Sequence, residues 1–153
     1  MPRLIRATVA MSVALMCAGA AFAGDRASKE EAKALLDKAV AHAKDVGTGK
    51  AFADFSRRDG GFVDRDLYVY CADMQGNLLA HGDNPNLIGK NLMELKDPDG
   101  FQPVKEAIRI LSGADAGTLN LKWPNPVTKK IEPKSVFLSK VKNDWCGVGY
   151  YTS

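Results

Sequence analysis

Residues 66–92 read DLYVYCADMQGNLLAHGDNPNLIGKNL, and this stretch decides the fold. Apolar and aromatic residues at 67–72 predict a strand, because successive side chains of a strand point to opposite faces. Residues 73–77 carry Asp, Gly and Asn, the residues of a tight turn, and residues 78–80 predict a second, short strand. The stretch therefore predicts a β-hairpin that delivers His81 and a polar loop to the edge of a sheet, a common way to build half of a binding pocket.

The first predicted strand has two distinct faces. Leu67, Val69 and Cys71 share one face, and Tyr68 and Tyr70 lie on the other. The paired tyrosines fit the wall of a ligand pocket, where each ring offers an apolar surface and a hydroxyl group. Packing of the same two rings in an ordinary core is an interpretation of equal weight.

The first 23 residues have the pattern of a secretory signal peptide. Two arginines precede an apolar run at 7–20, and Ala21-Phe22-Ala23 forms an A-x-A cleavage site. We therefore expect a mature chain of residues 24–153 that forms a single domain in the periplasm or outside the cell. An uncleaved N-terminal anchor is the alternative.

The charge balance excludes one class of function. The full chain of 153 residues carries 21 basic and 18 acidic side chains. Without residues 1–23, which hold Arg3 and Arg6 and no acid, the counts become 19 and 18. A nucleic-acid-binding domain needs a clustered basic face. The sequence predicts no nucleic-acid partner.

Helical and strand periodicities continue along the mature chain. Ser28 and Glu31 predict a capping box, and apolar spacing then predicts a helix that ends at about Val46. The other predicted elements are a helix capped by Thr48 and ended by Gly60-Gly61, a helix at 101–111, and strands at 117–123, 131–141 and 145–152. Strands joined by hairpins and grouped apart from the helices predict an α+β domain with an antiparallel sheet.

A set of motifs in order along the chain resembles one known family. The motifs are DLYVYxADMQGNLLAHG, NLIGKNL, DPDG, KWPNPVT, EPKS and GVGYY, and they span nearly all of residues 28–151. Together they resemble the single Cache domain family, type 2. The resemblance implies a PAS-like, five-stranded antiparallel sheet behind a long N-terminal helix. It also implies extracytoplasmic sensing of a small molecule, often a short carboxylate, in a pocket on one face of the sheet.

The chain departs from typical family members, which lie between two transmembrane helices and feed a chemoreceptor, kinase or cyclase. We expect a standalone secreted domain that binds a small organic ligand, with a membrane receptor, kinase or transporter as its possible partner. A protein–protein module whose pocket binds nothing is the alternative. A second, weaker alternative is an enzyme that acts on a small metabolite.

Three further residues join Tyr68 and Tyr70 as candidate ligand contacts. Lys134 lies in a predicted strand, where a lysine facing a half-buried sheet needs a counter-charge, and a carboxylate ligand would supply it. A lysine at the rim that extends to solvent is the alternative. His81 could donate to a carboxylate and, with an ordinary pKa of roughly 6.5, would make binding depend on pH. It could instead bond the adjacent turn. Trp123 either covers the pocket or packs under the hairpin.

The family topology makes the first and last strands neighbours, which brings Cys71 and Cys146 onto the same side of the sheet. Two cysteines that remain after signal removal usually pair in an oxidising compartment. Such a bond would constrain the unfolded chain by roughly 4 kcal/mol. Two buried thiols remain the alternative, because a bond between neighbouring strands is awkward.

The sequence contains few residues that could form a catalytic or a metal-binding site. It contains no C-x-x-C, G-x-S-x-G, P-loop or dinucleotide motif, and Asp73, Asp97 and Asp99 lack metal-binding spacing. His42 lies among alanines of the first helix and is interpreted as a helical histidine. We expect no catalytic residue, no cofactor and no metal.

Overall fold

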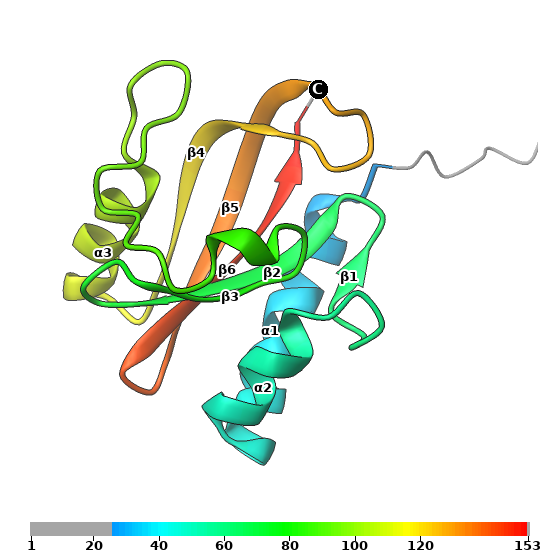
Figure 1. Ribbon diagram of the computed structural model, residues 1–153, viewed down its shortest axis with the longest axis vertical. Coiled ribbons are helices and arrows are strands. Elements are labelled where there is room, and N and C mark those ends of the chain that lie inside the picture. The colour runs from blue at the N-terminus through cyan, green and yellow to red at the C-terminus, as the bar shows by residue number, and fades with distance from the viewer. Residues whose placement is uncertain (1–25, 153) are drawn as a thin grey trace, which may run out of the picture.

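The computed structural model describes residues 26–152 (Figure 1). The helices are α1 (Lys29–Val46), α2 (Thr48–Phe55), the short 3-10 helix η1 (Pro85–Leu87) and α3 (Pro103–Gly113). The strands are β1 (Val63–Asp64), β2 (Leu67–Asp73), β3 (Leu78–His81), β4 (Ala116–Pro124), β5 (Ile131–Val141) and β6 (Asp144–Tyr151). All pairings are antiparallel.

The predicted α+β class is confirmed. The strands follow the order β1-β2-β6-β5-β4, and β3 pairs with β2 beside this path. The sheet has six strands where the resemblance implied five, because the two-residue strand β1 adds to the edge of β2. Within residues 26–152, no helix combines the length and the apolar character that a membrane crossing requires. The signal peptide predicted for residues 1–23 lies outside the described residues.

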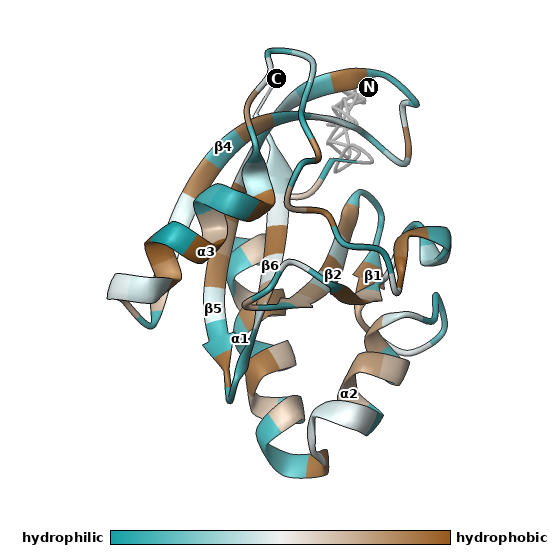
Figure 2. Ribbon diagram, turned by 60° about the vertical axis from the view of Figure 1, so that its left-hand side comes forward, coloured by the Kyte–Doolittle hydropathy of each residue, from teal (hydrophilic) through white to brown (hydrophobic). Residues whose placement is uncertain are grey.

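The sheet separates two hydrophobic layers. One layer joins α1 and α2 to β2 and β6, with Leu36, Phe55 and Val69 among its buried side chains. The other joins α3 to β4, β5 and β6, with Leu111 and Trp145 among its members. Figure 1 shows α3 apart from α1 and α2, with the sheet between them, and Figure 2 shows hydrophobic bands alternating with hydrophilic ones along β4. This alternation lets each strand serve both layers.

The helix ends follow local chemistry. Ser28 and Glu31 form the predicted capping box, since the Ser28 Oγ accepts from Glu31 N and the Glu31 carboxylate accepts from Ser28 N. Thr48, predicted to cap α2, is instead its first residue, and Gly47 occupies the cap with φ 86°. Helix α3 begins at Pro103 rather than at residue 101, because the residue before a proline is disfavoured in helical geometry.

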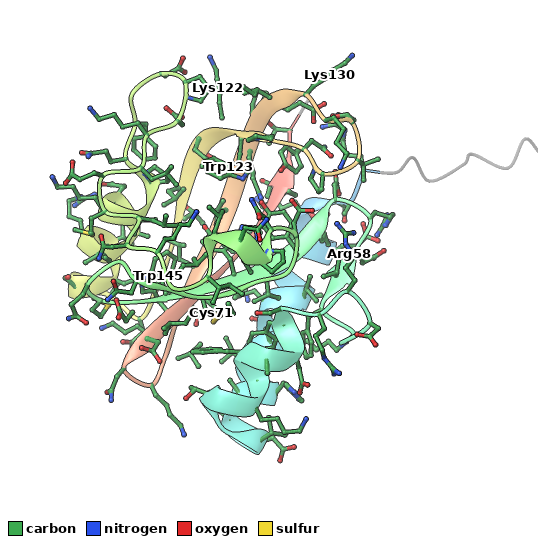
Figure 3. The ribbon with its side chains drawn as sticks, in the orientation of Figure 1. Arg58, Cys71, Lys122, Trp123, Lys130 and Trp145 are labelled. Atoms are coloured by element: carbon green, nitrogen blue, oxygen red, sulfur yellow. A yellow bond between two sulfur atoms is a disulfide. The ribbon has the colours of Figure 1, made fainter. Side chains whose placement is uncertain are left out.

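The predicted disulfide between Cys71 and Cys146 is confirmed. The two residues stand opposite each other on β2 and β6 and are bonded, with an S–S distance of 2.04 Å. Both are fully buried in the layer that contains α1. Cys71, labelled in Figure 3, therefore lies on the α1 side of the sheet, as the period of two in β2 predicts.

Candidate functional site

The face of the sheet opposite α1 carries a cavity under the loop that joins β3 to α3. The centres of water-sized spheres can occupy about 40 Å³ of this cavity. All five residues predicted to contact ligand line it, namely Tyr68, Tyr70, His81, Trp123 and Lys134. They come from β2, β3, β4 and β5, so the sheet itself brings them together.

An apolar roof closes the cavity. Its side chains come from the β3–α3 loop and the start of α3, and include Leu87, Leu92, Leu95, Pro103 and Val104. The sequence predicted a pocket role for none of these residues. The spacing of the loop leucines has no helical or strand period, so periodicity does not single them out.

Backbone hydrogen bonds hold the roof in place. Gly89 N donates to Leu78 O, and Leu92 N donates to Gly76 O, each at 2.8 Å. Farther along the loop, the Asp97 carboxylate accepts from the backbone N–H groups of Phe101 and Lys122, which ties the loop to β4. The Asp97 carboxylate therefore fixes this part of the loop against β4. Within residues 26–152, no three His, Cys, Asp or Glu side chains gather to hold a metal ion.

Lys134 is a buried lysine without a counter-ion among the described residues. Only 3% of the residue is exposed, which rules out the rim lysine that extends to solvent. Its Nζ donates to the Tyr68 hydroxyl at 2.8 Å and lies 4.1 Å and 5.0 Å from the ring centres of Tyr68 and Tyr151. None of the ion pairs formed among residues 26–152 includes Lys134. Burial lowers the pKa of Lys134 to about 7, an effect that the charges of Asp83 and Asp66 only partly offset.

The side chain of Lys134 has room over β6 because the neighbouring residue of that strand is Gly149. A Cβ atom at position 149 would lie 2.4 Å from Lys134 Cε, and one at position 147 would lie 2.8 Å from the Tyr70 ring. The alternating glycines of β6 thus accommodate one tyrosine and the lysine stem.

His81 is held as a neutral hydrogen-bond donor. Its Nδ1 accepts from the backbone N–H groups of Asn84 at 2.8 Å and Asp83 at 3.2 Å. The ring hydrogen therefore resides on Nε2, in a ring that lines the cavity. The Asn84 side chain closes the same turn by accepting a hydrogen bond from Asn86 N. His81 thus bonds the adjacent turn through Nδ1, as one of its two interpretations predicts, and its contact with a ligand through Nε2 stays a prediction.

The prediction that His81 makes ligand binding depend on pH near neutrality is wrong. Burial, followed by the charge of Lys134, lowers the pKa of His81 to about 3. The imidazole is therefore uncharged throughout the physiological range. Lys134, with its pKa near neutrality, is the pocket group that changes charge there.

This pKa has a consequence for acid stability. The folded state binds a proton at His81 less readily than the unfolded chain, whose histidine has a pKa of 6.5, so stability falls as pH drops from 6.5 toward 3. Between pH 6.5 and 4.5, we expect the free energy of unfolding of His81→Gln to fall by about 1–2 kcal/mol less than that of the wild type. Urea denaturation at a series of pH values measures the effect. The matched control is His42→Gln, and an equal dependence in wild type and His81→Gln would contradict the buried, neutral state.

The aromatic side chains frame the two ends of the pocket face. Figure 3 shows Trp123 on β4 and Trp145 on β6 toward opposite ends of the sheet. Trp145 is fully buried, and its indole N–H donates to Asp73 O, so it is a structural wall. Trp123 is partly exposed at the other end, as a residue covering the pocket would be. Burial raises the pKa values of Tyr68 and Tyr70, which keeps both hydroxyls protonated.

Comparison with known proteins agrees with this architecture. The chain is 30% identical over 79 residues to the methyl-accepting chemotaxis protein McpP of Pseudomonas putida, and 33% identical over 89 residues to the sensor histidine kinase MctS of Rhizobium johnstonii. These matches cover 52% and 57% of the chain but only 14% and 19% of the two relatives. The chain therefore spans less than a fifth of the length of either relative.

Solved structures show the same fold. A methyl-accepting chemotaxis protein from Vibrio parahaemolyticus superposes with a TM-score of 0.69 at 26% identity, covering 80% of this chain and 87% of that one. A Cache chemosensory domain described for its recognition of carboxylic acids superposes with a TM-score of 0.62 at 21% identity, covering 81% and 88%. The family model of the single Cache domain, type 2, matches residues 4–153. The chain belongs to this family of single Cache domains.

Proposed function

We propose that this domain binds a short organic monocarboxylate in the cavity beneath the β3–α3 loop, and that it acts in extracytoplasmic sensing. The observation that carries the proposal is Lys134, a buried cation that lines the cavity and forms no ion pair with any of residues 26–152. An unpaired buried charge is costly, and an anionic ligand would neutralise it. The carboxylate would lie against Lys134 Nζ and would accept from His81 Nε2.

The size and lining of the cavity limit the ligand. A single water requires about 10–15 Å³ on the same measure, so about 40 Å³ suits a ligand of roughly two or three carbons. Its apolar part would face the leucines of the roof, while Tyr70 and Trp123 exclude water. One ammonium group balances one negative charge. A dicarboxylate would leave its second charge unpaired among apolar side chains.

The relatives support a role in signalling. McpP is a chemotaxis protein, MctS is a sensor histidine kinase, and one neighbour in structure is described for carboxylic acid recognition. We propose a periplasmic location and a membrane receptor or kinase that responds to the loaded domain. The chemistry is recognition without turnover. A ligand-free protein–protein module is favoured less, because the large hydrophobic side chains exposed within residues 26–152 are Ile88, Val127 and Ile131, with no aromatic among them.

A melting experiment with matched ligand pairs tests the proposal. Acetate and propionate are expected to raise the melting temperature, by roughly 10 °C at a hundredfold excess over the dissociation constant. Acetamide and propionamide have nearly the same shape without the charge and are expected to give no shift. Hexanoate and succinate, which exceed the cavity in length or charge, are expected to give little. Equal shifts with acids and amides, or none with any short acid, would overturn the assignment.

A further inference from the structure

Lys134 is also a primary amine that forms no ion pair within the part of the chain that the structure describes. It lies inside a cavity, donates one hydrogen bond to a phenol, and has apolar or uncharged neighbours. We infer that Lys134 condenses reversibly with the carbonyl carbon of a small 2-oxo acid and holds it as an imine. This inference rests on the proposed function, because the same pocket must admit a short carboxylate.

The surroundings of Lys134 favour an uncharged amine. Tyr68 from β2 and Tyr151 from β6 face it with rings and hydroxyls, and His81 from β3 is neutral. The nearest acids that influence it are Asp83 and Asp66, and neither forms an ion pair with it. A lysine desolvated in an apolar pocket is one of the recognised forms of an activated amine nucleophile. Its pKa of about 7 leaves roughly half of the molecules with a free amine at neutral pH.

The condensation balances without a further reactant. The Nζ lone pair forms a bond to the carbonyl carbon as the carbon–oxygen π bond breaks, and one proton passes from the nitrogen to the oxygen to give a neutral carbinolamine. The nitrogen then forms a double bond to carbon while the hydroxyl leaves with a second proton as water. In sum, amine, ketone and one proton give a protonated imine and water. Nothing is oxidised or reduced, and hydrolysis reverses each step.

A 2-oxo acid suits this site better than a simple aldehyde. The protonated imine carries the charge that the ammonium carried, and the adjacent carboxylate neutralises it inside the apolar cavity. Two uncharged donors, the Tyr68 hydroxyl and His81 Nε2–H, remain beside the adduct. Gly149 leaves the lysine stem space to follow the change at Nζ, since a Cβ there would overlap Lys134 Cε.

Reductive trapping with pyruvate tests the inference. The full chain is incubated at pH 7 with pyruvate and cyanoborohydride, which reduces a protonated imine, and the modified lysines are located by peptide mass spectrometry. We expect the Lys134 adduct to form at least about tenfold faster than adducts at exposed lysines such as Lys130, because burial lowers the pKa of Lys134 and so raises its share of free amine at this pH. Lactate, in which an alcohol replaces the ketone, should give no adduct. Propionate should protect Lys134 by keeping it protonated.

The outcomes separate this inference from the proposed function. If pyruvate labels Lys134 no faster than Lys130, the imine is overturned. This comparison is made within the wild-type protein, so it holds even if Lys134→Arg fails to fold. If pyruvate raises the melting temperature without labelling Lys134, covalent capture fails and carboxylate binding stands. If neither pyruvate nor propionate shifts the melting temperature, both fail. Loss of the rapid adduct in Lys134→Arg supports the assignment to this amine.

Discussion

Replacing Cys71 and Cys146 together with alanine is expected to lower the free energy of unfolding by about 4 kcal/mol. The bond joins residues 75 positions apart, so it removes a large closure entropy from the unfolded chain. Both residues are fully buried between the central strands and α1, so the alanines would also leave small cavities that add to the loss. For a domain of this size, the effect approaches half of an ordinary total stability.

Urea denaturation with and without reductant measures this effect. Reductant should lower the midpoint of the wild-type protein most of the way to that of the double variant, which also carries the cavities, and should leave the double variant unchanged. The double variant thus serves as the control for any other action of the reductant. Alkylation of Cys71 and Cys146 without reductant, or a midpoint insensitive to reductant after both thiols are freed, would contradict a stabilising bond.

The arrangement of the pocket was predictable wherever strand periodicity decides it. Alternation in β2 separates Tyr68 and Tyr70 from Cys71, because consecutive side chains of a strand cannot share a face. Once β5 is recognised as a strand, Lys134 and Val136 must lie on the same face. Because β5 pairs with β6, the side chain of Lys134 then lies next to Gly149. Only the family topology, however, brings β2 next to β6.

Other features depend on contacts that no local pattern records. Strand β1 has two residues, too few to show a period, and it forms because Arg65 adopts a positive φ of 54° in the turn before β2. The neutral state of His81 requires the backbone of the following turn to fold back on Nδ1. Burial of Asp66 is likewise long-range, since its carboxylate accepts from Ala27 N and from Asn125 Nδ2. Sequence spacing is silent on all three.

Replacing Lys134 with methionine is expected to stabilise the ligand-free protein and abolish carboxylate binding. In the wild type, the pKa of Lys134 falls from 10.5 to about 7, so burial of the charged form costs on the order of 4 kcal/mol at pH 6. Methionine has a similar length and no charge. Loss of the donor to the Tyr68 hydroxyl costs about 1 kcal/mol in return. The net gain at pH 6 is therefore about 2–3 kcal/mol.

The pH profile identifies the source of this gain. Between pH 7 and 10.5 the unfolded wild type binds more protons at residue 134 than the folded protein, so wild-type stability rises with pH across this window. Lys134→Met lacks that rise, and its advantage should be largest below pH 7 and should vanish near pH 10. Urea denaturation at pH 6, 8 and 10 follows the difference, with Lys140→Met as control, since Lys140 lies on the same strand and pairs with Asp115 at the surface.

The variant separates binding from stability because the two effects have opposite signs. A merely structural lysine would give a destabilised variant, and its weaker ligand response would then reflect damage to the fold. If Lys134 instead keeps an unpaired charge in the pocket for a ligand, Lys134→Met should melt at a higher temperature than the wild type and show no shift with propionate. A destabilised variant at pH 6, or one that retains the propionate shift, would show that the site does not work through this charge. At a fixed pH below 7, the stability lost to an unpaired buried lysine is recovered when an anion enters, which couples occupancy to the stability of the domain.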